Sequence, residues 1–265
     1  FLLGFFAAGQ SFADHVVTLV AGERPPYIGS GLPKNGYVVE LVDEAFRRKD
    51  HRVKIDFVPW ARARILSDSG QADGILPADY QDRLLAKDGY VYSDPFPGGA
   101  IGLLKKKSLA VSYAKDDVRT QSTLFQSLKG YRFGMVRGGL SLPALDEAPS
   151  LDKALVNSDI QNLDMLGADR IQFALIDKFS AADLMVGQRP NLIGQLEFMT
   201  PPLAQRDFYL GLSNKTKNHR QLLAAFNGGL AEIKQDGTLE KIMNRHGLFL
   251  PKKVTANKVQ LTIGT

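Results

Sequence analysis

The sequence predicts an α/β fold with two lobes, each a mostly parallel sheet flanked by helices. The first observation is a βαβ pattern over residues 16–58, where a β-branched run, a helical apolar stripe and an alternating run follow one another. The second is the return of this rhythm after Lys107, over residues 131–198. The third is the Pro201-Pro202 break, after which one strand and two helices close the chain. Two similar βαβ runs indicate two lobes.

The elements of the first half follow from their apolar patterns. Residues 16–21 form a β-branched run that is typical of a central parallel strand. Residues 38–46 place their apolar side chains on one helical face. Residues 52–58 alternate apolar and polar side chains, which predicts a second strand. Further along we predict a helix over 61–69, a strand over 74–76 and a short helix that carries Arg83.

The second half repeats the alternation of strands and helices. The same criteria predict strands over 100–104, 131–136, 154–156, 171–176, 192–198 and 208–212. Helices are predicted over 120–130, 140–147 and 179–186, near Asp164, and in the two closing segments before Gly247.

Composition excludes several classes of protein. The chain has 265 residues, of which 44% are hydrophobic and 23% charged, as in ordinary globular proteins. It contains no cysteine, which excludes a thiolate metal site, a disulfide framework and a cysteine nucleophile. The net charge is +5, and the basic residues are scattered except at Lys105–Lys107. We therefore expect no nucleic-acid partner, and we expect the lysine run to be a solvated strand end.

The two ends of the chain are expected to lie outside the folded part. Residues 1–13 form a short apolar run that ends in Ser11-Phe12-Ala13, a pattern of small residues typical of a signal-peptidase site. The run is shorter than the roughly 20 apolar residues that cross a bilayer. We expect a signal-peptide remnant and an exported protein, with a buried N-terminal strand as the alternative. Residues 251–265 are expected to form a C-terminal tail.

Several short segments occur in a set order along the chain: GERPPY (22–27), NGYVVELVDEAF (35–46), FVPW (57–60), GQADGI (70–75), Arg83, YSDPF (92–96), SLKGYRFGMVRGG (127–139), ADRIQFALID (168–177) and QDGTLEKIMNRHG (235–247). In this order and spacing they make the chain resemble the extracellular solute-binding proteins of family 3, the polar amino-acid-type receptors of bacterial ABC importers. The resemblance extends from about residue 16 to 250, nearly the whole mature chain.

The resemblance implies the type II fold of periplasmic binding proteins, in which two lobes joined by two hinge strands close over a ligand. Lobe 1 would comprise residues 14–104 and 207–250, and lobe 2 residues 108–203. The crossings between the lobes would fall near 104–108 and 203–208.

The function implied by the resemblance is capture of a small zwitterionic or anionic, amino-acid-like solute and its delivery to an ABC transporter permease. Binding would shift the protein from an open to a closed arrangement of its lobes. The expected location is the periplasm of a Gram-negative bacterium, and the expected state is a monomer.

Arg83 is the strongest candidate for a ligand-binding residue. By resemblance it matches the arginine that holds the ligand carboxylate in a bidentate pair, and a guanidinium in a partly dry cleft is a strong anchor for a carboxylate. The alternative is a surface arginine that pairs with Asp79 or Asp82.

Four further candidates lie in the first half of the chain. Trp60, the single tryptophan, follows Pro59 at a strand-to-helix turn, where it would stack on the ligand or pack in the core. Tyr27 and Arg24 match two family positions at which aromatic residues often face the ligand. The arginine at 24 departs from that pattern and indicates either a second anionic group on the ligand or a solvent-facing side chain. Glu23 is expected to bind an ammonium group or to pair with Arg24.

The second lobe offers two candidate contacts with the ligand. Arg137, Gly138 and Gly139 precede a predicted helix, where backbone N–H groups can bind an anion, although a tight turn is the alternative. Asp177, at the end of a predicted strand, matches the family's acid that pairs with an α-ammonium group. Its competing role is the N-cap of the helix that follows.

Ala78 and the residues before it depart from the family pattern. Family members that bind α-amino acids usually bring hydroxyls or aligned carbonyls from the strand before the arginine. Here that strand is Leu76-Pro77-Ala78, which has no hydroxyl, and Pro77 has no N–H. The ligand is therefore not required to be a standard amino acid.

Two other functions remain open alongside solute capture. Some proteins of this fold are dehydratases, and that reaction would need Glu23 or Asp177 as an acid or base. The protein could instead be the ligand-sensing partner of a membrane receptor. The chain has no GxSxG, HExxH or P-loop pattern, and its four histidines lack metal-ligand spacing. We therefore predict no catalytic residue, no metal and no cofactor.

Overall fold

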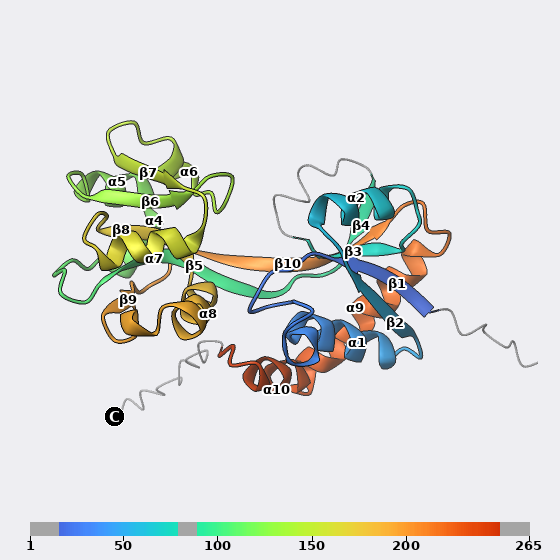
Figure 1. Ribbon diagram of the computed structural model, residues 1–265. Helices are drawn as coiled ribbons and strands as arrows, with labels where there is room; N and C mark the ends of the chain where they lie inside the picture. The colour runs from blue at the N-terminus through green and yellow to red at the C-terminus, as the bar shows by residue number, and fades with distance from the viewer. Residues whose placement is uncertain (1–15, 79–88, 250–265) are drawn as a thin grey trace, which may run out of the picture.

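The protein folds into two lobes that are joined by two long strands (Figure 1). The computed structural model describes residues 16–78 and 89–249. One lobe holds the strands nearest the N-terminus and the last two helices, and the other holds the middle of the chain. The strands β5 (Phe96–Lys106) and β10 (Ala204–Ser213) run between the lobes. The predicted two-lobed α/β architecture is confirmed.

The described sheet of lobe 1 contains three neighbouring parallel strands and one strand that runs antiparallel to its neighbours. β1 and β2 are parallel and in register from Val16↔Arg52 to Ala21↔Phe57. β3 lies parallel to β1 on its other side, and β10 pairs antiparallel with β3 and with β4. The strands are β1 (Val16–Ala21), β2 (Arg52–Phe57), β3 (Gly74–Ala78), β4 (Tyr90–Tyr92) and β10 (Ala204–Ser213).

The helices of lobe 1 bury the apolar faces that the sequence predicted. On α1 (Tyr37–Arg47) every residue of the predicted stripe is fully buried. This stripe packs in one core with the apolar face of α9 (His219–Gln235) and α10 (Thr238–Arg245). The described part of lobe 1 also contains α2 (Trp60–Asp68) and the short 3₁₀ turn η1 (Pro33–Asn35). Burial of these faces drives the packing of the helices against the sheet.

Two features of α9 fix how closely it approaches α1. Gly229 faces the backbone of α1 at Ala45, where a side chain would collide with the Ala45 carbonyl. One turn earlier, the Phe226 ring lies 5.4 Å from the Phe46 ring and 6.2 Å from the Phe96 ring, measured between centroids. Gly229 allows the close contact between α9 and α1, and the phenylalanine rings fill the space beside it.

Lobe 2 has a similar sheet. β6 lies between β7 and β8 and is parallel to both, and β5 pairs antiparallel with β8 and β9. The strands are β5 (Phe96–Lys106), β6 (Arg132–Val136), β7 (Asp152–Val156), β8 (Phe173–Asp177) and β9 (Leu196–Phe198). The helices are α4 (Lys115–Arg119), α5 (Gln121–Ser127), α6 (Pro143–Asp146), α7 (Asp159–Gly167), α8 (Lys178–Gln188) and the 3₁₀ turn η2 (Pro190–Leu192).

The two crossing strands pair with each other and so connect both sheets. The strand order is β2-β1-β3-β10-β5-β8-β6-β7, with β5 and β10 antiparallel in the middle. Phe96, the first residue of β5, packs in the core of lobe 1, whereas Ile101 packs in a core of lobe 2. We therefore propose that the first crossing lies between these two residues; the predicted lobe limits of 14–104 with 207–250 and of 108–203 stay a prediction.

Lys105 corrects the expectation of a solvated lysine run. Its side chain is buried, and its Nζ donates to the Leu109 carbonyl at 2.8 Å and pairs with Glu197. A buried ammonium is tolerated here because its donors have acceptors.

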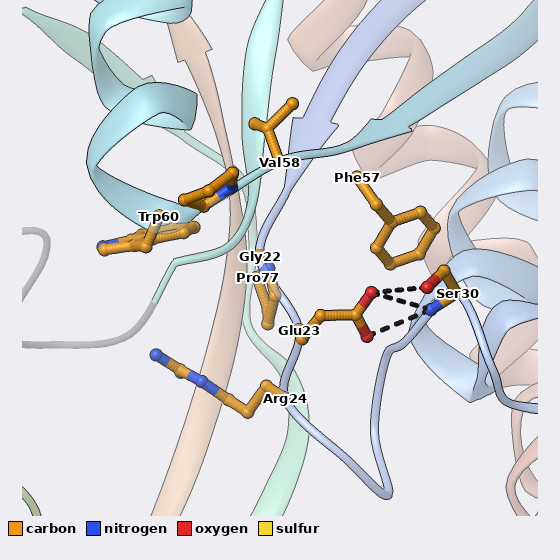
Figure 2. A pocket seen from close by; sticks show the side chains of 9 residues that line it. Gly22, Glu23, Arg24, Ser30, Phe57, Val58, Trp60 and Pro77 are labelled. Carbon is orange, nitrogen blue, oxygen red and sulfur yellow. Dashed lines mark hydrogen bonds between the residues drawn. The ribbon is translucent and has the colours of Figure 1, made fainter.

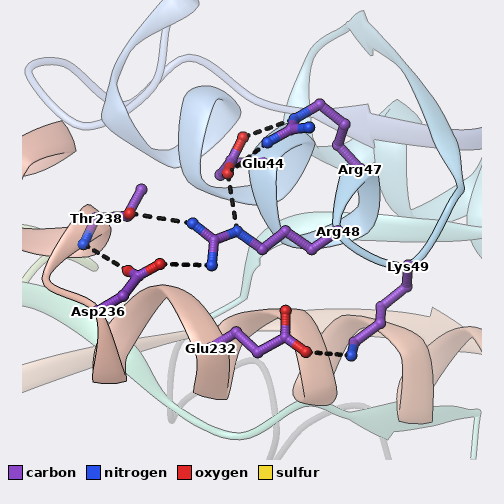
Figure 3. A network of polar contacts seen from close by, with 7 residues as sticks. All are labelled: Glu44, Arg47, Arg48, Lys49, Glu232, Asp236 and Thr238. Carbon is purple, nitrogen blue, oxygen red and sulfur yellow. Dashed lines mark hydrogen bonds and ion pairs between the residues drawn. The ribbon is translucent and has the colours of Figure 1, made fainter.

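A polar network ties α1 to the start of α10 (Figure 3). Arg48 donates from Nε to Glu44 Oε1 at 2.9 Å, from Nη1 to Asp236 Oδ2 at 2.6 Å and from Nη2 to Thr238 Oγ1 at 3.1 Å. Asp236 Oδ1 in turn accepts the backbone N–H of Thr238 at 2.9 Å. The hydrogen bonds from Thr238, followed by that from Arg48, lower the pKa of Asp236 to about 2.

This network predicts a loss of stability in acid. The folded-state pKa of Asp236 lies below its ordinary value of 3.8. The stability that the ionised carboxylate contributes is therefore complete above pH 3.8 and is lost as the pH falls towards 2. We expect Asp236→Asn to lower the midpoint of urea unfolding at pH 6 and to match the parent chain near pH 2. The control Asp152→Asn removes an exposed pair with Arg132 and should change the midpoint little at pH 6. An Asp236→Asn deficit that persists undiminished at pH 2 would contradict this account.

The predicted signal-peptide remnant (1–13) and C-terminal tail (251–265) lie outside the described residues. Within residues 16–78 and 89–249, no helix combines the length and apolar content that crossing a membrane needs.

Candidate functional site

Two cavities of about 510 Å³ each lie beside strand ends and the loops that follow them. The first is formed by the loops after β1 and β2 in lobe 1 (Figure 2). The second is formed mainly by β6, α7, β8 and α8 of lobe 2. Arg24 lines both, and it is joined in the second by its neighbour Pro25 and by Arg206 of β10. Both lobes therefore contribute to the second cavity.

In the first cavity, Glu23 and Arg24 point in different directions (Figure 2). Glu23 Oε1 accepts the Ser30 hydroxyl at 2.6 Å, and both its carboxylate oxygens accept the Ser30 N–H at 3.1–3.2 Å. Arg24 extends towards the side of the cavity where Trp60 lies. The two side chains do not form the pair that was one alternative for Glu23.

Trp60 begins α2 and forms one wall of the first cavity. Its ring lies against Gly22, where an added Cβ would stand 3.2 Å from the ring. The rest of the apolar wall is formed by Phe57, Val58, Pro59 and Pro77. Ala78 is fully buried at the end of β3 and is not part of the lining. The strand therefore presents a proline to the cavity, with no hydroxyl to accept a hydrogen bond from a ligand ammonium group and no N–H to donate one to a ligand carboxylate.

In the second cavity, two guanidinium groups face the same aromatic ring. The Cζ atoms of Arg24 and Arg206 lie 5.6 Å and 6.0 Å from the centroid of Phe208, which is fully buried. Such cation–π contacts hold the two charged groups at the cavity wall. Arg206 was not predicted from the sequence, because its place in an alternating strand gives no sign of which face looks into a cavity.

Three carboxylates also line the second cavity: Asp159 at the start of α7, Asp177 at the end of β8, and Asp183 on α8. Burial raises the pKa of Asp159, and the nearby charge of Asp177 raises it further, whereas the Asn162 amide and the charge of Arg206 lower it. Burial also raises the pKa of Asp183. Arginines and aspartates around one space suit a ligand that carries charges of both signs.

Asp177 connects the two lobes. Its Oδ1 accepts the N–H groups of Phe179 and Ser180 at 3.0 Å, which is the N-cap role that was one of its two alternatives. The same oxygen accepts the hydroxyl of Tyr27 of lobe 1 at 2.7 Å. Asp177 is 3% exposed, and no side-chain or backbone donor in the described part of the chain reaches its Oδ2.

Tyr27 lies in the core of lobe 1 and not in the lining of either cavity. Its ring makes an edge contact with Phe208, 5.1 Å between centroids, and another with Phe179 at the start of α8, 6.3 Å away. Burial raises the pKa of its hydroxyl, and the Asp177 carboxylate raises it further. The first turn of α8 is thus docked on lobe 1.

The turn at residues 137–139 differs from its prediction. Gly138 and Gly139 line the second cavity, whereas Arg137 is exposed and outside the lining. The helix after this turn begins only at Pro143, not at 140, because a proline favours the first position of a helix. The N–H groups of Arg137 and Gly139 already bind the carbonyls of Val156 and Val136. The turn therefore has fewer donors for an anion than the sequence suggested.

Arg83 lies outside the described residues, so its role as the carboxylate anchor stays a prediction. Within residues 16–78 and 89–249, no three His, Asp or Glu side chains come together in a way that could hold a metal ion. The residues that were predicted and that do line a cavity are Glu23, Arg24, Trp60, Gly138, Gly139 and Asp177.

Comparison with known proteins places these features in a family. The sequence profile of the bacterial extracellular solute-binding proteins, family 3, matches residues 18–249. A comparison with curated protein sequences gave no significant match.

Solved structures share the fold at low sequence identity. A probable amino-acid ABC transporter extracellular-binding protein from Bacillus subtilis superposes with a TM-score of 0.69 at 14% identity, covering 89% of this chain and 99% of its own. A histidine kinase sensor domain with similarity to periplasmic binding proteins gives 0.61 at 21% identity, covering 90% and 99%. The GluR0 ligand-binding core from Nostoc punctiforme, solved with L-glutamate, gives 0.60 at 12% identity, covering 88% and 99%.

Proposed function

The chain belongs to the bacterial extracellular solute-binding proteins, family 3, and we propose that it captures a small zwitterionic or anionic, amino-acid-like solute between its lobes. The observation that carries this proposal is the second cavity, where Arg24 and Arg206 share a space with Asp159 and Asp177. Positively and negatively charged side chains from both lobes can hold a charged solute from two sides.

We further propose that closure of the lobes over this solute presents the protein to an ABC transporter permease. A ligand that contacts both lobes binds the closed arrangement more tightly than the open one, and it shifts the population by that difference in affinity. The protein would act as an exported monomer in the periplasm. A histidine kinase sensor domain has a similar fold, so we retain ligand sensing as a second function of the same lobe closure.

The dehydratase alternative finds less support in the geometry. It requires Glu23 or Asp177 as a proton donor or acceptor for the substrate. The carboxylate of Glu23 accepts hydrogen bonds from the N–H and the hydroxyl of Ser30, and Asp177 Oδ1 accepts three hydrogen bonds. Incubation with prephenate or arogenate tests this alternative: product formation that Glu23→Gln abolishes would establish an enzyme and displace the binding proposal.

A thermal-shift screen of amino acids, small carboxylates and polyamines tests the proposed function. A compound at about 100 times its Kd should add roughly 2.7 kcal/mol to the free energy of unfolding. Because Arg83 is the expected carboxylate anchor, Arg83→Ala should weaken binding of the best carboxylate about tenfold or more. The control Arg119→Ala removes an exposed arginine of α4 and should leave binding unchanged. Failure of every compound to shift the parent chain would count against solute capture.

A further inference from the structure

One oxygen of the Asp177 carboxylate is fully used in hydrogen bonds within the protein. Its Oδ1 accepts hydrogen bonds from Tyr27, Phe179 and Ser180, and its Oδ2 is shielded from solvent. The shield includes β5 at Gly99, where an added Cβ would collide with both Asp177 Oδ2 and the Tyr27 hydroxyl. Oδ2 has no hydrogen-bond partner among the described residues, but it is buried against β5. A ligand ammonium group could reach it only if β5 or Tyr27 moved, and such a movement opposes binding.

Asp159 is placed differently. It lies on the first turn of α7, lines the same cavity and is only partly buried, so that its carboxylate is accessible from the cavity. Burial and the charge of Asp177 both disfavour its ionised form, as its raised pKa reflects. A positive group entering the cavity would offset both effects, since an opposite charge at close range favours the ionised carboxylate. Arg206 is the nearby cation, and Asp177 and Asp183 are the other carboxylates of this cavity.

The described residues of β3 bring no carboxylate to the first cavity. Pro77, which faces the first cavity, has neither an N–H nor a hydroxyl, and a positive group needs acceptors in any case. Arg24, which lines both cavities, suits the negative end of a solute. In the second cavity, Arg24 of lobe 1 and Asp159 of lobe 2 therefore supply charges of opposite sign.

We propose that Asp159, and not Asp177, is the carboxylate with which lobe 2 binds the positive group of a zwitterionic solute. This inference rests on the proposed function and names the residue that would decide between an amino acid and the same acid without its amino group. Asp177 has a positioning role, because it caps α8 and fastens the first turn of that helix to lobe 1 through Tyr27.

The test compares pairs of compounds that differ only in the α-amino group: L-glutamate with glutarate, L-leucine with isocaproate, and L-lysine with ε-aminocaproate. Affinities are measured by calorimetry for the parent chain, Asp159→Asn, Asp159→Glu, Asp177→Asn and the exposed control Asp116→Asn. Circular dichroism and urea unfolding check that each variant folds, and Asp159→Ser replaces Asp159→Asn if that variant does not.

We expect the parent chain to prefer one amino acid over its partner by about tenfold or more, which corresponds to roughly 1.4 kcal/mol. Asp159→Asn should abolish that preference while binding the partner compound as before, and Asp159→Glu should restore part of it. Asp177→Asn should change both affinities of a pair by the same factor, and Asp116→Asn neither.

Two results would overturn the inference while leaving the proposed function intact. One is a preference that survives Asp159→Asn but is lost in Asp177→Asn. The other is a parent chain that binds the compounds without an amino group as tightly as the amino acids. A parent chain that binds none of the six compounds, nor any compound of the wider screen, would remove the proposed function and this inference with it.

Discussion

Phe226→Ala is expected to lower the free energy of unfolding by about 3–5 kcal/mol, the usual cost of removing a buried phenylalanine ring. The ring is fully buried on α9 and packs against Phe46 of α1 and Phe96 at the start of β5. Three segments that are far apart in the sequence meet at this ring. The cavity left by alanine would be lined by large, well-packed side chains that cannot easily close around it.

Urea unfolding followed by circular dichroism measures this effect. The matched control is Phe249→Ala, since Phe249 is 64% exposed and its loss should change the free energy by less than about 0.5 kcal/mol. If Phe226→Ala costs no more than the control, the contact between α1 and α9 is not what stabilises lobe 1.

Patterns that arise within one element were predictable from the sequence. The apolar stripe of α1 repeats with the helical period, and the structure buries all of it. The strands alternate or run apolar according to how many of their faces are covered. The Pro201-Pro202 break correctly preceded the strand that leads back into lobe 1. In the helices and strands, the residue types alone determine which face is buried.

Features that depend on contacts between distant segments were not predictable in this way. Lys105 belongs to a basic run that is typical of a solvated strand end, yet it is buried because Glu197 and the Leu109 carbonyl accept its N–H groups. Tyr27 and Asp177 were both candidates for contact with the ligand. Nothing in their local sequence indicates that they bind each other across 150 positions of the chain.

The site shows the same division between local and long-range information. The turn after β1 and the tryptophan after β2 were found because motifs mark them, and both line the first cavity. Asp159 and Arg206 were missed, because an aspartate at a helix start usually serves the helix itself and an arginine in a strand usually faces solvent. Only the three-dimensional arrangement shows that they share one cavity.

Gly99→Ala is expected to disturb the connection between the lobes and to cost about 2–4 kcal/mol of stability, because it combines overpacking with the loss of a charged hydrogen bond. Gly99 lies on β5, and an added methyl group would collide with both the Tyr27 hydroxyl and Asp177 Oδ2. Neither side chain can move freely, since both are buried. The methyl group must therefore separate the two partners or displace β5.

The matched control is Gly187→Ala on α8, the helix that Asp177 caps. An added Cβ at Gly187 meets no atom within 4 Å, and alanine is preferred over glycine inside a helix by up to about 1 kcal/mol. This variant should be neutral or slightly more stable.

Small-angle X-ray scattering of the ligand-free chain provides a second measurement for Gly99→Ala. If the contact between Tyr27 and Asp177 holds the first turn of α8 against lobe 1, the variant should sample a wider range of lobe separations than the parent chain. Tyr27→Phe, which removes the hydroxyl without adding bulk, should move the scattering in the same direction by a smaller amount. Scattering that is unchanged in both variants would mean that the two crossing strands alone set the angle between the lobes.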